Sequence, residues 1–225
     1  MDPSGRRRLG TEDGRLVLHE EVLARGHKRA LSALGPVMEA AGFYLGGGTA
    51  IALQLGHRRS MDLDWFTNET LGDALVLARR LEDQGLPLEV RLVRMGTLYA
   101  DLFGVRVAWF EYRYPLLAET VAWPGCSCRL ASLDDLACMK LSAVAQRGAK
   151  KDFIDLYALV TRHRPLLELL AAYEQKYKLQ NIAPILYGLS YFDDADKERT
   201  PTMLWDVDWR TVKRAIRAWV KGLAS

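Results

Sequence analysis

The most informative stretch of the sequence is Leu45–Thr67, LGGGTAIALQLGHRRSMDLDWFT, because a glycine turn, an apolar helix and an acidic strand follow one another within it. Gly46, Gly47 and Gly48 carry no Cβ, so the backbone can approach a phosphate closely and can adopt a positive φ. A helix predicted to start near Thr49 points its free N–H groups and the positive end of its dipole at the same phosphate. The first half of the stretch therefore predicts a phosphate site.

The second half of the stretch predicts a metal site. The sequence MDLDWF alternates as a strand does, so Asp62 and Asp64 project from one face while Leu63 and Trp65 enter the core. Two neighbouring carboxylates repel each other unless a cation lies between them. Hard oxygen ligands suit Mg²⁺, which proteins usually hold with one or two carboxylates and substrate phosphates. Either motif alone is common in turns and on solvated strands, but their order favours phosphoryl chemistry.

Composition narrows the class of protein. The 225 residues are 49% apolar and 26% charged, which is ordinary for a globular chain. No apolar run reaches the roughly 18 residues that span a bilayer, and the N-terminus lacks a signal-peptide core, so we expect a cytoplasmic protein without a membrane segment. Three cysteines favour free thiols over a disulfide framework. A net charge of +3 does not by itself indicate a nucleic-acid binder.

Periodicity before residue 125 predicts a small mixed sheet backed by helices, which is an α/β (mixed α+β) fold. A helix begins at Glu20 and ends at Gly42, and Pro36 should break or kink it. Further helices and strands are expected at residues 43–45, 68–84, 88–95, 97–103 and 105–112.

The C-terminal part predicts helices at 133–148, from 150 onward and at 205–223. Lys140 and Arg147 lie seven residues apart on one stripe of the first, and Lys151 and Asp155 have the i,i+4 spacing of a surface ion pair. The last helix carries a basic stripe of Lys213, Arg214, Arg217 and Lys221, which is either a solvated face or a surface for an RNA backbone.

These motifs together resemble the AbiEii/AbiGii nucleotidyltransferase toxins of the DNA polymerase β-like superfamily. The resemblance rests on Gly47-Gly48-Thr49, on His57-Arg58-x-Ser60-x-Asp62-x-Asp64-x-Phe66, and on the spacing Lys140-x₆-Arg147-x₃-Lys151-Asp152-x₂-Asp155. It implies one nucleotidyltransferase-fold protein with a flexible arm at 1–19, a catalytic lobe at 20–125 and a helical lobe at 126–225, with the active site in the cleft between the lobes.

The resemblance also implies the chemistry. A nucleoside monophosphate would pass from a nucleoside triphosphate to an acceptor hydroxyl, with the 3′ end of tRNA as the expected acceptor. The metal, Mg²⁺ or Mn²⁺, would be held by Asp62 and Asp64, and a DNA-binding antitoxin of the AbiEi type would be encoded nearby. The catalytic set would be Asp62, Asp64, Lys140 and Asp152, and the nucleotide-binding set Gly47, Gly48, Thr49, Arg58, Ser60, Arg147 and Lys151.

The chain departs from the superfamily pattern at one position. A third acidic residue usually lies on the strand after the Asp-x-Asp strand, and here that slot falls on Ala108. Glu111 is near in sequence but is expected on the other face of the strand. The missing acid supports one alternative, an inactive binding module. Another alternative concerns the acceptor, which could be a protein or a small molecule such as an aminoglycoside. The preferred nucleotide, the general base and the oligomeric state are not determined by the sequence.

Overall fold

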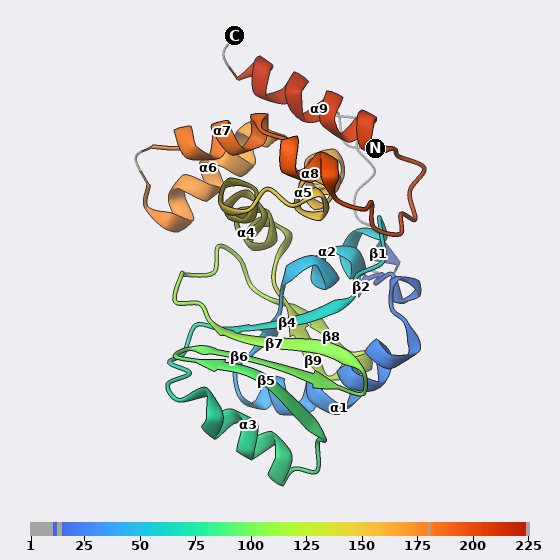
Figure 1. The fold of residues 1–225 in the computed structure, drawn as a ribbon, viewed down its shortest axis with the longest axis vertical. Helices are drawn as coiled ribbons and strands as arrows, with labels where there is room; N and C mark the ends of the chain where they lie inside the picture. The colour runs from blue at the N-terminus through green and yellow to red at the C-terminus, as the bar shows by residue number, and fades with distance from the viewer. Residues whose placement is uncertain (1–10, 13–14, 180, 224–225) are drawn as a thin grey trace. The chain divides into compact units, whose positions relative to one another are not determined.

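The acidic stretch forms strand β4 (Asp62–Thr67) of a seven-stranded sheet. The structure is a computed structural model that describes residues 11–12, 15–179 and 181–223 (Figure 1). Most of the predicted N-terminal arm, including Arg6–Arg8, lies outside the described residues. The chain divides into two compact units, which we call the sheet unit (Leu23–Ala50 and Ser60–Ser132) and the helical unit (Met1–Val22, Ile51–Arg59 and Leu133–Ser225). The division predicted from the sequence, at residue 125, stays a prediction.

The sheet unit has the strand order β5-β6-β7-β4-β3-β9-β8. The pairs β4–β7 and β3–β9 are parallel and the other pairs are antiparallel, which confirms the predicted mixed sheet. Its other strands are β3 (Tyr44–Leu45), β5 (Leu88–Arg94), β6 (Thr97–Leu102), β7 (Val105–Glu111), β8 (Val121–Trp123) and β9 (Cys128–Leu130). Its helices are α1 (Arg25–Ala40), α3 (Ala74–Asp83) and the short 3₁₀ turn η2 (Pro124–Cys126).

Strand alternation separates the two faces of this sheet. Leu63 and Trp65 of β4 are fully buried, together with Trp109 of β7. The Trp109 indole N–H donates to the Met38 sulfur of α1 at 3.0 Å, so this face of the sheet packs against α1. Helix α3 contacts β5 and β6, and Figure 1 shows both helices beside the sheet. Asp62 and Asp64 point to the opposite face.

Helix α1 differs from the prediction at Pro36. The helix runs without a break from Arg25 to Ala40, with Pro36 inside it. Leu34 and Met38 on either side of the proline are fully buried, so tertiary packing outweighs the lost hydrogen bond. The predicted end is confirmed, because Gly42 has φ +73° directly after the helix.

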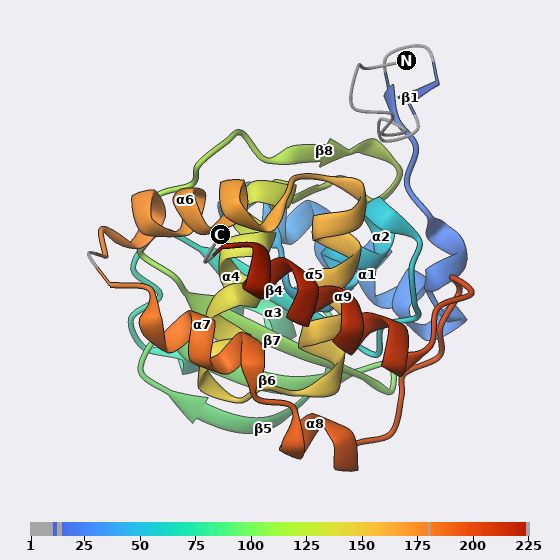
Figure 2. The same cartoon turned by 90° about the horizontal axis from the view of Figure 1, so that it is seen from above.

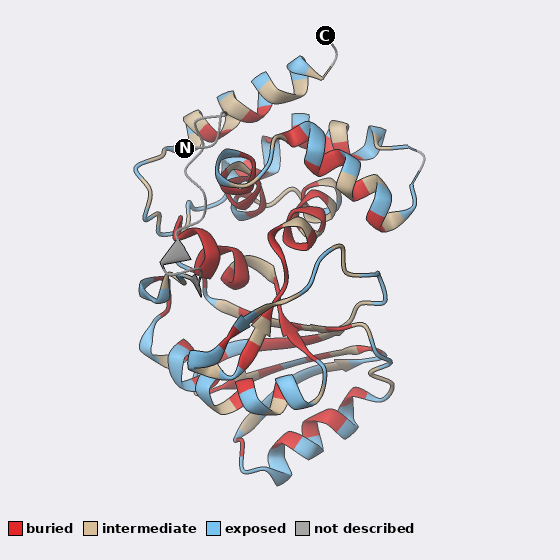
Figure 3. Cartoon of the chain, turned by 180° about the vertical axis from the view of Figure 1, so that it is seen from behind, coloured by how far each residue is buried: buried red, intermediate tan, exposed pale blue. Residues whose placement is uncertain are grey.

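The helical unit is built almost entirely from helices. They are η1 (Glu20–Val22), α4 (Leu133–Gln146), α5 (Lys150–Arg162), α6 (Leu166–Tyr177), α7 (Ala183–Ser190), α8 (Asp193–Lys197) and α9 (Trp209–Gly222), with a two-stranded pair of β1 (Thr11–Glu12) and β2 (Arg15–Leu16). Figure 2 shows α9 crossing α5, and it also contacts α7. Figure 3 shows α4 and α5 as largely buried, so they form the core of this unit.

Helix α2 (Gly47–Leu55) begins in the sheet unit and ends in the helical unit. No helix among the described residues combines the length and apolarity that a membrane span requires. All three cysteines are free thiols, as predicted. Burial raises the pKa of Cys128 and of Cys138 to about 12, so both are inert thiols at neutral pH.

Candidate active site

The glycine turn is fastened to the acidic strand within the sheet unit. The Gly46 N–H donates to the Asp64 carbonyl at 2.8 Å, and the Thr49 hydroxyl donates to the Asp62 carbonyl. Gly47, the first residue of α2, has φ +62°. A Cβ at Gly47 would overlap the Asp64 carboxylate, whose Cγ would lie 3.0 Å away. Two features therefore favour glycine at position 47: the positive φ of the backbone, and the Asp64 carboxylate that occupies the space of a Cβ.

The two carboxylates of β4 lie on one face of the sheet, as predicted. Both side chains are half-buried, whereas Leu63 between them is fully buried. Strand β7 runs parallel beside them, with Arg106 next to Asp62 and Ala108 next to Asp64. Arg106 Nη2 lies 2.7 Å from Asp62 Oδ1, and 72% of the arginine side chain is exposed. An exposed arginine thus partly neutralises the acidic pair.

Glu111 does not replace the acid that is absent at position 108. It pairs in register with Thr67, on the other face of the sheet from Ala108. Its Oε2 accepts the Leu71 N–H at 2.9 Å and its Oε1 lies 2.5 Å from Arg113 Nε. The Leu71 N–H is the main cause that lowers the pKa of Glu111, with Arg113 assisting. Glu111 is thus an anion that fixes a loop.

The oxygen atoms of Asp62 and Asp64 fit a divalent cation of the Mg²⁺ type. Both are hard ligands on a rigid strand beside the helix start, and the absent Cβ of Gly47 leaves the Asp64 carboxylate its space. Within the described part of the chain, no group of three or more His, Cys, Asp or Glu side chains is arranged to hold a metal. An ion at this strand would therefore need further oxygens from a substrate, which is how Mg²⁺ is commonly bound.

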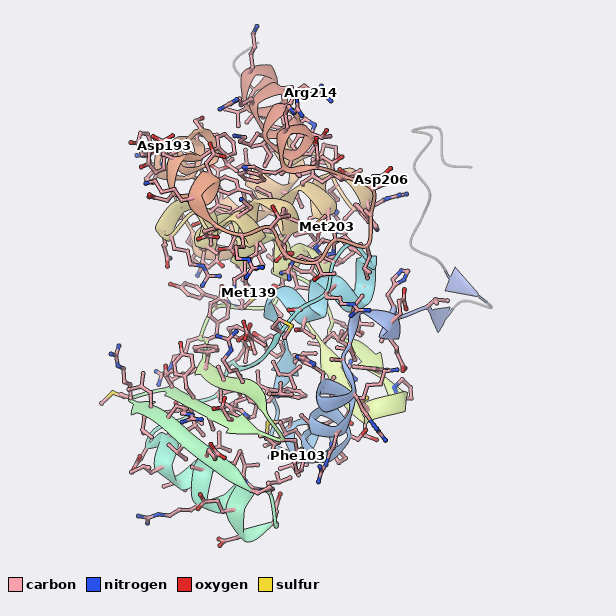
Figure 4. All side chains as sticks on the ribbon, turned by 45° about the vertical axis from the view of Figure 1, so that its right-hand side comes forward. Phe103, Met139, Asp193, Met203, Asp206 and Arg214 are labelled. Carbon is pink, nitrogen blue, oxygen red and sulfur yellow. The ribbon has the colours of Figure 1, made fainter. Side chains whose placement is uncertain are left out.

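A second set of predicted residues forms a buried ion cluster in the helical unit. The ion cluster consists of His57, Arg58, Lys140, Arg147, Asp152 and Asp155. His57 and Arg58 follow α2, Lys140 lies on α4, Arg147 directly follows α4, and both aspartates lie on α5. An isolated bridge between Arg58 and Met203, a residue labelled in Figure 4, fixes the backbone at this point.

Asp155 is the centre of the ion cluster. The side chain of this aspartate is fully buried. Its Oδ1 accepts from His57 Nε2 at 2.7 Å and from Arg58 Nε at 2.6 Å. Its Oδ2 accepts from Arg58 Nη2 at 2.8 Å and lies 2.8 Å from Lys140 Nζ. The spacing of Lys151 and Asp155 predicts a surface ion pair, and this prediction is wrong because the Asp155 side chain is buried.

Asp152 holds the other side of the ion cluster. It accepts from Lys140 Nζ at 2.8 Å and from Arg147 Nε and Nη2 at 2.7 and 3.0 Å. Asp152 is fully buried, whereas 58% of the Arg147 side chain is exposed. Arg147 is therefore the member of the ion cluster that can reach a ligand in solvent.

The electrostatics of the ion cluster are set by competition between burial and pairing. Burial alone would raise the pKa of Asp155, but Arg58 and Lys140 outweigh it and hold that pKa well below its usual range. The same balance, with Lys140 and Arg147, lowers the pKa of Asp152. A carboxylate with a lowered pKa is a poor proton acceptor, which weakens the case for Asp152 as a general base.

In the ion cluster Lys140 is charged and His57 is neutral. Burial lowers the pKa of Lys140, but Asp155 and Asp152 outweigh it and the net pKa is raised. Burial is also the main cause that lowers the pKa of His57, so its neutral ring donates the Nε2 proton to Asp155. At neutral pH the ion cluster therefore holds three cations and two anions, a net charge of +1.

Of the predicted site residues, two groups are assembled by the hydrogen bonds and ion pairs given above, none of which involves Ser60 or Lys151. Gly47, Gly48 and Thr49 meet β4 at the start of α2, and Arg58, Lys140, Arg147 and Asp152 meet in the ion cluster. Ser60 is buried just before β4, and Lys151 is exposed on α5. His57 and Asp155 are not among the predicted site residues, although both are positions of the motifs. The signal for Asp155 is its place one helical turn after Asp152, on the same face of α5.

Comparisons with known proteins identify the family of the chain. A family model described as "Nucleotidyl transferase AbiEii toxin, Type IV TA system" matches residues 101–219, more than half of the chain. The uncharacterized protein aq_aa25 of Aquifex aeolicus (strain VF5) is 38% identical over 165 residues, which cover 69% of this chain and 76% of that protein.

Two solved structures share the fold. JHP933 from Helicobacter pylori has a TM-score of 0.54 at 17% identity, covering 92% of this chain and 95% of that one. MenT4, a nucleotidyltransferase toxin from Mycobacterium tuberculosis H37Rv, has a TM-score of 0.51 at 15% identity, covering 86% and 82%. At 17% and 15% identity these two structures show only that the fold is shared. The family is shown by the match to the family model. The chain belongs to the AbiEii family of nucleotidyl transferase toxins, which are described as part of type IV toxin–antitoxin systems.

Proposed function

We propose that this protein transfers a nucleoside monophosphate from a nucleoside triphosphate to an acceptor hydroxyl. The observation that carries the proposal is the pair Asp62 and Asp64 on one strand face, held against the N-terminus of a helix that starts with glycine. Paired carboxylates, free helical N–H groups and a nearby glycine together suit a metal-bound triphosphate. Membership of a nucleotidyl transferase family supports the same reaction.

The proposed reaction balances as a displacement at the α-phosphorus. The acceptor oxygen forms a new bond to that phosphorus, the bond to the bridging oxygen between the α- and β-phosphates breaks, and pyrophosphate leaves. The hydroxyl proton passes to bulk water, since Ala108 provides no base beside Asp64. Mg²⁺, when bound, would stabilise the charge on the transferring phosphate.

The residues of this chain would bind and orient the triphosphate. Gly47, Gly48 and Thr49 would offer backbone N–H groups at the start of α2. On the family resemblance we also assign Lys140 and Arg147 to the triphosphate; 58% of the Arg147 side chain is exposed, so its guanidinium can meet phosphate oxygens. Lys140 would act from within the ion cluster, where Asp152 and Asp155 hold its ammonium in place.

The acceptor and the biological partner are finer proposals. We propose an RNA acceptor, the 3′ end of tRNA, on the family resemblance alone. The description of the family as part of a toxin–antitoxin system supports a cognate antitoxin, which we propose is a DNA-binding protein encoded next to this gene. A gene neighbourhood without such a protein would count against this pairing.

The test is to incubate the purified protein with total bacterial RNA, Mg²⁺ and each labelled nucleoside triphosphate in turn. We expect one RNA class to be labelled, and the Asp62→Asn/Asp64→Asn variant to lose both labelling and metal-dependent triphosphate binding. Asp101→Asn is the matched control, because Asp101 lies on the same face of the sheet, on β6, and pairs with Arg91. Unchanged triphosphate binding in the double variant would refute the metal role.

Other outcomes of the same assay separate the alternatives. Label on a protein or on an added small molecule would keep the chemistry and change the acceptor. Triphosphate binding without any transfer would favour a binding module, and Ala108 is the observation that favours this second reading. The variant Ala108→Asp would then be expected to gain transfer, because its carboxylate would lie beside Asp64 in register.

A further inference from the structure

One face of the sheet in the sheet unit is left uncovered by the helices of that unit. Alternation and register place Asp62, Asp64 and Phe66 of β4 on this face, beside Arg106, Ala108 and Phe110 of β7. Tyr99 of β6 pairs with Ala108, and Tyr44 of β3 pairs with Phe66. Helices α1 and α3 pack on the opposite face, where Trp65 and Trp109 are buried. We call the uncovered side the open face.

Aromatic side chains form a continuous row on the open face. The aromatic row consists of Tyr44, Phe66, Tyr99, Phe110, Tyr112 and Tyr114. Ring centroids of Phe66 and Phe110 lie 5.1 Å apart, those of Tyr99 and Phe110 5.6 Å, and those of Tyr44 and Phe66 6.1 Å. The row continues from Phe66 to Tyr112 at 5.6 Å and from Tyr112 to Tyr114 at 5.0 Å. Each ring supports the next, so the row is a fixed array.

Two rings of the aromatic row are open to solvent. Tyr99 is 40% exposed and Tyr114 is 46% exposed, while Phe66 and Phe110 are half-buried between them. The core of the sheet unit is already complete on the other face, so these rings are not needed to close it. Exposed, rigidly supported aromatic rings are the feature on which single-stranded nucleic acids stack their bases.

The aromatic row is continuous with the acidic pair. Phe66 is two residues beyond Asp64 on the same strand and the same face, which places it about 7 Å along the strand from that carboxylate. The accessible ring of Tyr99 lies on β6, in register with Asp64 through Ala108 and thus about 10 Å away across two strand spacings. A base stacked on this ring leaves its sugar hydroxyl on the same face as Asp64. The inference therefore rests on the proposed nucleotidyl transfer and names where its acceptor binds.

The other end of the open face does not offer a comparable site. A hollow of about 610 Å³ there is lined by Arg91, Asp101 and Arg106, among other residues. Arg91 pairs with Asp101 at 2.5 Å, and Arg106 pairs with Asp62 at 2.7 Å. The charges in this hollow compensate one another, which does not favour a phosphate. Stacking at the aromatic end is thus the better supported mode of binding.

We propose that the aromatic row binds the unpaired bases of a single-stranded RNA acceptor. The rings of Tyr99 and Tyr114 provide the accessible stacking surfaces; Phe110 supports the first and Tyr112 the second. Because every base has a π-face, such a surface accepts many sequences and requires only that the bases are unpaired. A duplex of the same length buries its base faces within its own stack and should bind weakly.

The experiment measures binding of a fluorescein-labelled single-stranded RNA of about 12 nucleotides, within the range that such sites cover. Anisotropy is recorded without nucleoside triphosphate for the wild type, Tyr99→Ala, Tyr114→Ala and the conservative variants Tyr99→Phe and Tyr114→Phe. We expect each alanine variant to weaken binding about 5- to 150-fold and each phenylalanine variant to bind as the wild type does. Tyr187→Ala is the matched control, because this tyrosine is 73% exposed on α7 of the helical unit.

The result that overturns the proposal is an unchanged RNA affinity in both alanine variants, or a duplex that binds as tightly as the single strand. A wild type that does not bind the RNA would overturn it as well. The Asp62→Asn/Asp64→Asn variant separates the two proposals, because labelling tests transfer and anisotropy tests RNA binding. A variant that loses transfer but still binds RNA would support both proposals. RNA transfer that persists with unweakened alanine variants would leave the transfer proposal standing and remove the stacking surface. RNA binding that depends on the rings, without any transfer by the wild type, would do the reverse.

Discussion

Replacing Asp155 by asparagine should destabilise the helical unit severely, although the two side chains have nearly the same shape. Both carboxylate oxygens of Asp155 face cationic or N–H donors, from His57, Arg58 and Lys140. Whichever way the asparagine amide is placed, its NH₂ group meets a donor. Removing one partner of a buried pair costs about 3–5 kcal/mol, and the added donor conflict favours the upper part of that range.

The assay is urea unfolding followed by far-UV circular dichroism at pH 7. With a slope of about 2.5 kcal/mol per M, the expected loss lowers the midpoint by about 1–2 M. Arg147→Gln is the control, because this arginine pairs with Asp152 but is 58% exposed. The control variant should lose less than about 1 kcal/mol, since solvent screens its contact.

The pH dependence provides a second check on Asp155→Asn. The pKa of Asp155 is well below its usual range in the folded protein, so its stabilising effect is fully present above the unfolded value of about 3.9. That stability is lost as the pH falls through the folded value. The difference between wild type and variant should therefore be constant from pH 7 to about 5 and shrink in stronger acid. A difference below about 1 kcal/mol at pH 7, or one that grows on acidification, would refute the reasoning.

Two further predictions concern the sheet unit. Gly47→Ala should reduce nucleotidyl transfer sharply, because its Cβ would displace the Asp64 carboxylate; Gly42→Ala, with φ +73° but open space around it, should lose stability without losing transfer. Equal activity of the two variants, measured by label transfer, would contradict this account. Arg106→Gln should lower the Mg²⁺ concentration needed for triphosphate binding by up to about fivefold, because an exposed arginine pair on Asp62 is worth at most about 1 kcal/mol. A calorimetric titration that shows weaker metal binding in this variant would contradict the idea that Arg106 and Mg²⁺ compete for Asp62.

The elements around the acidic strand could be predicted because their signals are local. Alternation over Asp62–Thr67 fixed which residues are buried, and the register with β7 then brought Ala108 next to Asp64. The glycine turn predicted a helix near Thr49, and α2 begins two residues earlier, at Gly47. Period, turn chemistry and glycine conformation all act within a few residues of one another.

Other elements were predicted with wrong bounds or not predicted. Helix α3 begins at Ala74 instead of residue 68, because Asp73 caps it by accepting the Leu75 N–H. Helix α9 begins at Trp209 instead of residue 205, where Asp208 accepts the Thr211 N–H. Strands β8 and β9 span three residues each, too few for a periodic pattern, so they depend on the partners that cover them. Helices α6 and α7 were not predicted, although α6 carries apolar residues at helical spacing.

The ion cluster could be predicted only in part, because spacing along the chain does not reveal contacts across it. Helical periodicity placed Lys140 at the rim of a buried face, where a lysine usually extends to solvent. The structure buries it against Asp152 and Asp155 on the next helix. The ion pair that fixes this arrangement, between Arg58 and Asp155, joins residues 97 positions apart. No local pattern encodes such a pair.

The same separation governs when the helical unit can form during synthesis. Ribosomes add about 5–20 residues per second, so His57 and Arg58 emerge about 5–20 s before Asp155, which is 98 positions after the histidine. Throughout that interval the arginine lacks the carboxylate that its burial requires, and the nascent chain must keep it in water. The helical unit therefore cannot mature from the N-terminus forward. It forms only after α5 has emerged, and translation that stops before Asp155 would leave a chain without the ion cluster.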